Sequence, residues 1–349
     1  MRISAVEATC QSPGEWHTNR GSDRVTRSIA RKIAVTFPNN ILEIPGRIGL
    51  GTAGLGEPGA DQDREVAAVN FALDTGYRLI DTAEMYGAGG AERVIGRALK
   101  AFGASRRSEL FIISKVYPEN ASHAGTVKAC EASLERLDSE YIDLYLLHWR
   151  GPHAFTETLR GFDELLERKL VRNIGVSNFD VDDLLEWRKA ERRVGIRATA
   201  KADEISYRLD RRGIEYGQLA WQRAHGIQTI AYGPLGQGEL TQHPVLMEIG
   251  RKRGISAAQI ALAWCLREPD IVVITKSAKP ERIADNFGAS TVSLTAEELA
   301  RIDQAFPLRH RWLKGNPLIR YARSTARKLI RQVKKPASRT ATSPTHGHV

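Results

Sequence analysis

Four residues in the first half of the sequence are of types that could together move a proton to or from a substrate oxygen. Asp81 and Tyr86 follow one apolar run, and Lys115 and His148 end the next two runs. Tyrosine has a pKa of roughly 10 in solution and is a poor acid or base near neutrality. A nearby lysine lowers that pKa, a carboxylate can hold the lysine charged, and a histidine can hydrogen-bond an oxygen that becomes negative. These side chains predict an acid–base site that uses no metal.

Each of the four residues also has a structural explanation. A lone aspartate at a strand end usually caps a helix or pairs with a surface lysine, and a lone tyrosine or histidine is more often a packing residue. A buried lysine is uncommon without a partner. A chemical role is favoured only if the elements that carry these residues bring them to one place.

Apolar, strand-like runs alternate with amphipathic, helix-like segments eight times along the chain. The runs LFIISK, IDLYLLH and IVVITK are continuously apolar, which is typical of parallel strands covered on both faces. This alternation predicts an α/β fold, a (β/α)8 TIM barrel. The predicted strands are 47–51, 78–81, 110–115, 142–148, 171–177, 198–205, 228–232 and 271–276. The most regular predicted helices are 65–75, 90–101, 124–136, 155–168 and 180–189.

In such a barrel, functional groups lie at the carboxyl ends of the strands and in the loops beyond them. Every predicted strand end from the second onward carries a polar or titratable residue, which a purely structural scaffold would not need. The first three such ends supply the four residues above. The later ends supply Ser177 and Asn178, Glu204, Tyr232, and Lys276 with Ser277.

Two features precede the second strand. An N-terminal β-hairpin is predicted over 33–37 and 41–44, around Pro38-Asn39-Asn40, and it could cap the barrel floor. Residues 49–54 form a GxGxxG pattern, which in a dinucleotide-binding fold would open a helix. The chain continues here as LGEPG, which cannot form the first turns of a helix, so a glycine-rich loop at the barrel mouth is favoured.

Composition bounds the remaining possibilities. The 349 residues, with 42% hydrophobic and 26% charged, are ordinary for a globular protein with one large core. The three cysteines form no CxxC or metal spacing, which favours a reducing compartment. No stretch approaches the roughly 20 apolar residues of a membrane span, and the N-terminus lacks a secretory apolar segment, so a cytoplasmic location is expected.

The net charge of +10 is concentrated in the C-terminal tail. Of the 51 basic residues, 11 lie in 308–349, which holds no Asp or Glu. We expect three parts: a disordered polar extension (1–31), the barrel (32–307) and a basic tail (308–349). The tail contains an amphipathic helix over 316–335, which could lie on an anionic membrane or nucleic acid or could pack on the barrel. No sequence-specific nucleic-acid binding and no particular oligomeric state are predicted.

Several of these segments together resemble the signatures of the aldo-keto reductase family. The resemblance spans about 33–307, nearly the whole predicted barrel, and its motifs occur in the family order. The matching segments are GYRLIDTAEMYG (76–87), LD (137–138) with YIDLYLLHW (141–149), IGVSNF (174–179), and ITKS (274–277) with ERI (281–283) and Asn286.

The resemblance implies a catalytic tetrad of Asp81, Tyr86, Lys115 and His148. Tyr86 would be the proton donor in the reduction of an aldehyde or ketone, and Lys115, paired with Asp81, would lower its pKa. His148 would orient and polarise the carbonyl group, with Trp149 beside it in the substrate site. Hydride would come from a nicotinamide cofactor.

The resemblance also implies the residues that bind this cofactor, and it favours NADPH over NADH. Ser177, Asn178 and Glu204 match the positions that contact the carboxamide, and Tyr232 matches the residue that stacks on the ring. The loop containing Gly233 and Leu235 would fold over the pyrophosphate. Arginine and lysine suit a phosphate dianion. The 2′-phosphate site would comprise Lys276, Ser277 and Arg282, and Asn286 would also bind the cofactor.

One position departs from the family pattern. Glu204 stands where the family usually has glutamine, and Asp203 replaces the usual asparagine before it. A glutamate could accept a hydrogen bond from the carboxamide but could not donate one, and it would add negative charge near the nicotinamide. Besides a working reductase, the sequence leaves open a cofactor-binding regulatory protein with little turnover, as are the potassium-channel β subunits of this family, and a scaffold whose tail binds a partner.

Overall fold

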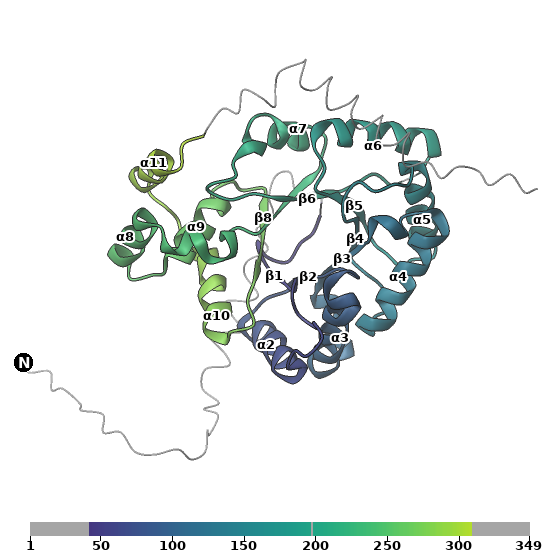
Figure 1. The fold of residues 1–349 in the computed structure, drawn as a ribbon, viewed down its shortest axis with the longest axis horizontal. Helices are drawn as coiled ribbons and strands as arrows, with labels where there is room; N and C mark the ends of the chain where they lie inside the picture. Colours follow the sequence, from purple (N-terminus) through teal and green to yellow (C-terminus); the bar gives the residue numbers. More distant parts are fainter. Residues whose placement is uncertain (1–41, 197, 309–349) are drawn as a thin grey trace, which may run out of the picture. The chain divides into compact units, whose positions relative to one another are not determined.

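The computed structural model describes residues 42–196 and 198–308, all of which fall in one compact unit. Within these ranges eight parallel strands close into a barrel in chain order, with β8 paired to β1 (Figure 1). The predicted barrel and its strand order are therefore confirmed. The strands are β1 (Ile48–Gly51), β2 (Leu79–Asp81), β3 (Phe111–Val116), β4 (Leu144–Leu147), β5 (Ile174–Ser177), β6 (Ala202–Ser206), β7 (Gln228–Tyr232) and β8 (Ile271–Lys276).

Helices surround the barrel and connect successive strands (Figure 1). Half of the described helices begin at a side chain that accepts a backbone N–H of the first turn, for example Ser122 before α4 and Thr295 before α11. The described helices are α2 (Gln62–Thr75), α3 (Gly90–Phe102), α4 (His123–Leu137), α5 (Phe155–Glu167), α6 (Val181–Val194), α7 (Gln218–Ala224), α8 (Pro244–Arg253), α9 (Ala257–Leu266), α10 (Pro280–Gly288) and α11 (Ala296–Ala305). None of these helices is long and apolar enough to cross a membrane.

The segment before β1 corrects part of the sequence prediction. Of the predicted hairpin, only 42–44 lies within the described residues, and these three residues form no strand. Ile44 N donates to Leu42 O within the segment (2.9 Å) instead of to a neighbouring strand. Leu42 and Ile44 are buried and pack with the first inward-facing residues of the barrel strands, so they fill the barrel floor. The predicted 1–31 extension and the tail beyond 308 lie outside the described residues.

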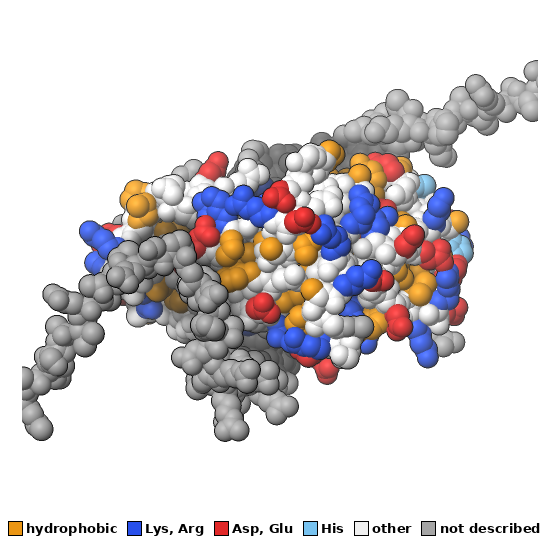
Figure 2. All heavy atoms as spheres, turned by 90° about the horizontal axis from the view of Figure 1, so that it is seen from below, with side chains coloured by type: hydrophobic (Ala, Val, Ile, Leu, Met, Phe, Trp, Pro, Cys, Tyr) orange, Lys and Arg blue, Asp and Glu red, His pale blue; other side chains and the backbone are white. Residues whose placement is uncertain are grey.

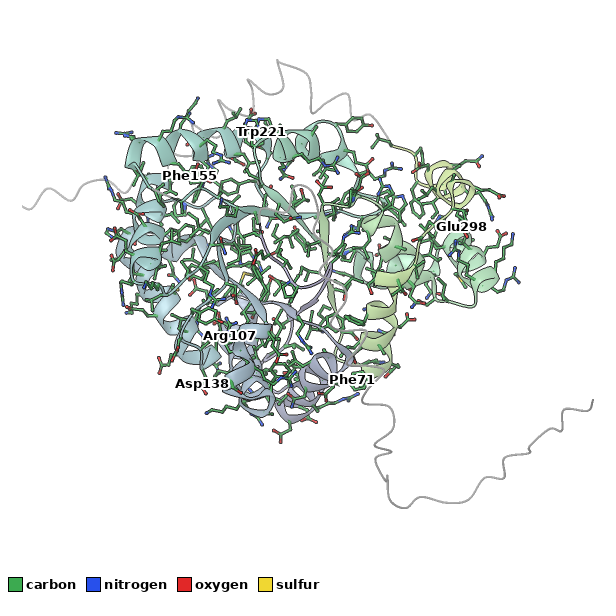
Figure 3. The ribbon with its side chains drawn as sticks, turned by 180° about the vertical axis from the view of Figure 1, so that it is seen from behind. Phe71, Arg107, Asp138, Phe155, Trp221 and Glu298 are labelled. Carbon is green, nitrogen blue, oxygen red and sulfur yellow. The ribbon has the colours of Figure 1, made fainter. Side chains whose placement is uncertain are left out.

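Apolar side chains fill both the barrel interior and the layer between strands and helices (Figure 3). In the outer layer, Phe155 at the start of α5 packs on Trp187 of α6 with ring centroids 5.1 Å apart. Phe155 also contacts Phe179, which follows β5, at 5.2 Å. Such pairs contribute about 0.5–1.5 kcal/mol beyond the burial of their area. This aromatic cluster therefore anchors the loop that begins at the end of β5.

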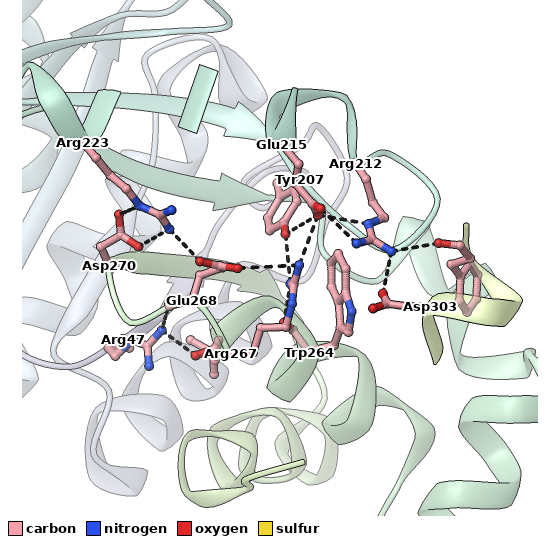
Figure 4. Close-up of polar contacts among 12 residues, drawn as sticks. Arg47, Tyr207, Arg212, Glu215, Arg223, Trp264, Arg267, Glu268, Asp270 and Asp303 are labelled. Carbon is pink, nitrogen blue, oxygen red and sulfur yellow. Dashed lines mark hydrogen bonds and ion pairs between the residues drawn. The ribbon is translucent and has the colours of Figure 1, made fainter. Parts of the chain in front are cut away.

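A different type of contact holds the loop that follows β6 (Figure 4). Glu215 accepts hydrogen bonds from Arg212 (2.9 Å) and from Arg267, which follows α9 (3.2 Å). Both guanidinium groups lie over the ring of Trp264, at 5.0 and 3.8 Å from its centroid. Arg212 also pairs with Asp303 of α11 (2.6 Å). These half-buried, charge-assisted contacts tie the loop after β6 to α9 and α11.

The described surface carries charges of both signs. On the face in Figure 2, Lys and Arg side chains are interspersed with Asp and Glu. Many of them form pairs, such as Arg253 with Glu298 (2.6 Å) and Arg301 with Glu248 (2.6 Å). This mixture agrees with the sequence observation that the excess positive charge belongs to the tail.

The glycine-rich loop after β1 is held against the turn that begins at Tyr86. No helix starts until Gln62, so the GxGxxG pattern is not a dinucleotide fingerprint. Gly56 has φ +66°, and a Cβ on it would lie 2.0 Å from the carbonyl carbon of Gly90. A Cβ on Gly87 would lie 2.5 Å from Gly56 O. Only glycine permits this close approach, which sets the position of the turn.

We expect Gly56→Ala to destabilise the protein more than Gly59→Ala does. Both glycines have positive φ, +66° and +81°, but a Cβ on Gly59 would meet nothing within 4 Å. The left-handed conformation costs about 1–2 kcal/mol in either variant, and the clash at Gly56 adds roughly 1–3 kcal/mol. Urea denaturation would measure the free energy of unfolding of both variants. Equal decreases would show that the backbone near Gly90 can accommodate a Cβ at residue 56.

Candidate active site

The inward-facing positions at the carboxyl end of the barrel bring the predicted catalytic residues together. Side chains alternate along a strand, so residues two apart face the same side. Leu79, Ile113, Leu146 and Ala202 all lie in the interior cluster of the barrel. The residues two positions further along are Asp81, Lys115, His148 and Glu204. The fold itself therefore forms one polar layer above the apolar interior.

Lys115 is the centre of this layer. Its side chain is fully buried, and its Nζ forms a close ion pair with Asp81, whose side chain is 4% exposed. Nζ also donates to Thr82 O at 3.0 Å. An unpaired ammonium ion would be several kcal/mol less stable in such an environment. Asp81 and the backbone of the loop after β2 therefore keep the lysine charged.

Tyr86 and His148 complete the predicted tetrad. Tyr86 begins a short 3-10 turn beyond β2, and Lys115 Nζ lies 5.4 Å from the centroid of its ring. The rings of Tyr86 and His148 meet edge to face, with centroids 5.7 Å apart and an interplanar angle of 78°. The structure thus brings all four residues together at one end of the barrel.

Burial determines the protonation of Tyr86. It raises the pKa of the phenol well above its ordinary value, and the positive charge of Lys115 opposes that rise without cancelling it. The lowering influence expected of Lys115 is present, but the net shift is upward because desolvation is the larger effect. Tyr86 is therefore a protonated phenol at neutral pH, and Lys115 is placed to stabilise the phenolate left when that proton is given up.

His148 is neutral over the same range. Burial, together with the charge of Lys115, lowers the pKa of the imidazole to about 3. Its Nδ1 has no hydrogen-bond partner among the described residues. A neutral imidazole carries one N–H donor and no charge. His148 can therefore hydrogen-bond a substrate oxygen without competing with Tyr86 as the acid.

An aromatic wall adjoins this layer. Trp149 lies beside His148, with centroids 4.7 Å apart, and Tyr117 meets Trp149 edge to face at 5.3 Å. Glu84 Oε1 accepts from the backbone N–H of Tyr117 at 2.5 Å and so joins the loops after β2 and β3. Tyr117 was not selected from the sequence, although its place two residues beyond Lys115 is a signal that could have found it.

The predicted carboxamide-binding residues form a hydrogen-bonded row. Ser177 Oγ donates to Glu204 O (2.9 Å), and Asn178 Nδ2 donates to Ser177 Oγ (3.0 Å) and to His148 O (3.1 Å). Tyr232 OH donates to Asn178 Oδ1 (2.6 Å). Asn178 has φ +61°, an uncommon conformation for a non-glycine residue that turns the chain sharply at the end of β5. These contacts place the three side chains next to His148.

Glu204 lies deeper than the sequence suggested. Its side chain is 3% exposed, and Oε2 is 3.2 Å from Lys115 Nζ. Burial, and next the charge of Asp81, raise the pKa of Glu204 to about 8, against the opposing influence of Lys115. The carboxyl group is therefore uncharged at neutral pH. This corrects the expectation that it adds negative charge near the nicotinamide, and a protonated carboxyl group can also donate a hydrogen bond.

The remaining cofactor candidates lie beyond β7 and β8. Lys276 and Arg282 are exposed, and neither forms an ion pair with a described residue. Lys276 Nζ lies near the loop after β1. A Cβ atom added to Gly54 in that loop would be 3.9 Å from this nitrogen. Ser277 Oγ accepts from Lys279 N (3.1 Å), whereas Asn286 is buried on α10. After β7, Gly233 has φ +62° and Leu235 packs on the core.

Comparison with known proteins gives the class of this barrel. The pattern of the Aldo/keto reductase family matches residues 47–306. Methylglyoxal reductase YeaE of Escherichia coli (strain K12) is 40% identical over 266 residues, which cover 74% of this chain and 90% of that protein. Glyoxal reductase of Bacillus subtilis (strain 168) is 37% identical over 236 residues, 68% of this chain and 81% of that protein.

Solved structures agree with these relatives. A crystal structure of an aldo-keto reductase from Klebsiella pneumoniae in complex with NADPH has a TM-score of 0.70 and 39% identity. It covers 76% of this chain, which in turn covers 92% of it. The chain belongs to the aldo/keto reductase family.

We expect the imidazole of His148 not to titrate between pH 5 and 8. The pKa near 3 lies below that range, while an unperturbed histidine has a pKa of about 6.5. Because the unfolded chain then binds a proton that the folded protein does not, this residue makes the protein less stable as pH falls from about 6.5 towards 3. NMR of ring-labelled histidine, assigned with His148→Gln, measures the titration, and a midpoint near 6.5 would exclude the neutral imidazole.

Proposed function

We propose that this protein is an NADPH-dependent reductase that converts an aldehyde or ketone to the alcohol, with Tyr86 as the proton donor. The observation that carries the proposal is the position of Tyr86, whose ring lies against both the Lys115 ammonium group (5.4 Å) and the His148 ring (5.7 Å). A protonated phenol next to a fixed positive charge and a neutral N–H donor can protonate an oxygen that becomes negative. Family membership supports carbonyl reduction as the reaction.

Each residue of the site has a distinct task in this reaction. NADPH, when bound, supplies the hydride for the carbonyl carbon. Tyr86 transfers its phenolic proton to the carbonyl oxygen, and Lys115 stabilises the phenolate that remains. His148 donates an N–H to the same oxygen and holds the carbonyl group in place. Asp81 holds Lys115 charged and fixed, so that the site needs little rearrangement during the reaction.

The described residues fit a nicotinamide dinucleotide phosphate. Asn178 and Tyr232 offer amide and hydroxyl groups beside His148, where a nicotinamide carboxamide would bind. Lys276 and Arg282 are cations without a described carboxylate partner, unlike the paired arginines elsewhere on the barrel, and they suit a 2′-phosphate. The Klebsiella pneumoniae relative was crystallised with NADPH. We therefore assign NADPH as the cofactor.

The substrate is proposed at the level of chemical class. The aromatic wall of Tyr117 and Trp149 suits a small carbonyl compound with apolar or planar groups. Two relatives are named as reductases of methylglyoxal and of glyoxal. Both compounds are 1,2-dicarbonyls, which therefore come first in an assay panel of aldehydes and ketones. A wild-type protein that binds NADPH but oxidises it with none of them would instead be a cofactor-binding protein with little turnover.

Tyr86→Phe should abolish carbonyl reduction and leave NADPH binding nearly intact. The hydroxyl group acts only on the reacting oxygen, and general acid catalysis commonly contributes roughly 10²–10⁴-fold to a rate. NADPH oxidation with methylglyoxal measures the rate, and fluorescence titration measures cofactor affinity. Activity of the variant within about threefold of the wild type would exclude Tyr86 as the acid.

Replacing Lys276 and Arg282 with alanine should weaken NADPH binding far more than NADH binding. Only NADPH carries the 2′-phosphate, and a hydrogen bond to a charged group contributes about 1.5–3 kcal/mol, so the preference should shift by at least about tenfold. Lys252→Ala with Arg253→Ala is the matched control, because these cations already pair with Glu248 and Glu298. Equal weakening of both cofactors would show that Lys276 and Arg282 bind some other group.

A further inference from the structure

Lys115 is paired with two buried carboxyl groups, although the proposed mechanism needs only one. Asp81 reaches it from β2 and Glu204 from β6, and the exposed fractions of the three side chains are 4%, 3% and 0% for Asp81, Glu204 and Lys115. The Glu204 carboxylate lies at ion-pair distance, 3.2 Å, yet forms no hydrogen bond to the ammonium group through Oε2. Asp81 and Thr82 O already take up donors of Lys115.

This arrangement holds more negative charge than positive if both acids ionise. One ammonium ion between two carboxylates leaves a net charge of −1 in a dry interior, and two close carboxylates raise the pKa of one of them. Other described groups that face Glu204 do not supply a second cation. They are Tyr86 from the turn after β2 and Tyr232 from β7. Ser177 at the end of β5 and Asn178 after it contact only the backbone oxygen of Glu204.

The neighbouring acid on the same strand is separate from this group. Asp203 precedes Glu204, so its side chain faces the opposite side of β6. Its Oδ2 accepts from Gln222 (2.7 Å) and Gln218 (3.2 Å) of α7. Asp203 therefore takes no part in the charge balance around Lys115, and Glu204 is the acid of β6 that does.

We propose that Glu204 is a positioning residue of the active site, a second partner of Lys115 whose protonation sets how strongly the ammonium group acts on Tyr86. This inference rests on the proposed reductase function. Glu204 holds the proton, because burial and the charge of Asp81 raise its pKa to about 8. Below that pH, Lys115 faces a single carboxylate and its charge is available to Tyr86.

The proton on Glu204 makes catalysis sensitive to alkaline pH. When Glu204 loses its proton to solvent above about pH 8, a second negative charge lies 3.2 Å from the ammonium group. Lys115 then stabilises the Tyr86 phenolate less, so proton donation to the substrate slows. Glutamine at this position has nearly the shape of a protonated glutamate and cannot ionise, so Glu204→Gln removes the sensitivity.

The kinetic test compares each protein with itself at two pH values. We expect wild-type kcat for methylglyoxal reduction to fall by up to about 25-fold between pH 7.5 and 9.5, the limit that a single ionisation with a pKa near 8 predicts when the ionised form is inactive. Glu204→Gln should lose most of this fall, whereas the control Asp203→Asn, which also neutralises a buried acid of β6, should keep it. If Glu204→Gln shows the wild-type ratio, the proposal is overturned.

A second measurement does not depend on turnover. The infrared carbonyl band of a protonated carboxyl group, followed in ligand-free protein from pH 6 to 10, should lose one component near pH 8. That component should be missing in Glu204→Gln and present in Asp203→Asn. Its presence in Glu204→Gln would overturn the proposal even if that variant were inactive. A wild type that reduces no carbonyl compound would refute the proposed function, while the band would still decide whether Glu204 holds a proton.

Discussion

The site depends on one constraint, which is that a lysine ammonium ion must remain charged inside a closed barrel. Removing such an ion from water is costly, and only partners supplied by the surrounding strands offset the cost. Asp81 and the backbone of the loop after β2 meet this need directly. Other features of the site are arranged around that charge: burial and the charge together lower the pKa of His148, the ammonium group faces the ring of Tyr86, and Glu204 lies at ion-pair distance from it. The barrel therefore positions a single charge, and the acid–base chemistry is arranged around it.

Much of this arrangement could be predicted from the sequence, because parallel barrels obey simple rules. Continuously apolar runs identified the buried strands, and the strand ends identified which polar residues lie at the mouth. The strand that leads to His148 is predicted to begin at residue 142, whereas β4 begins two residues later, at Leu144. Asp143 explains the difference: its carboxylate accepts the backbone N–H of Ile112 (2.9 Å) and pairs with Arg107, and Ile142 forms only an isolated bridge with Val171.

Contacts across the barrel were beyond the reach of sequence patterns. Asp81 and Lys115 lie on adjacent strands, and register alone brings them near one another. Glu204 lies on β6, which pairs with neither β2 nor β3, so its contact with Lys115 depends on the width of the barrel and the lengths of the side chains. The net pKa of Tyr86 lies beyond sequence patterns for a related reason. The charge of its neighbour was evident from the sequence, whereas the extent of its burial was not.

The aromatic wall lies on different elements from the ion pair of Asp81 and Lys115. Asp81 and Lys115 belong to strands whose hydrogen bonds and interior packing fix them, while Tyr117 and Trp149 stand on loops just beyond β3 and β4. Loops tolerate substitution and insertion better than the elements they connect. Divergence of such a protein can therefore proceed by exchanging the wall while the proton-transfer layer is inherited unchanged. New substrate preferences then need not pass through an inactive ancestor, which is an evolutionary advantage of separating recognition from chemistry.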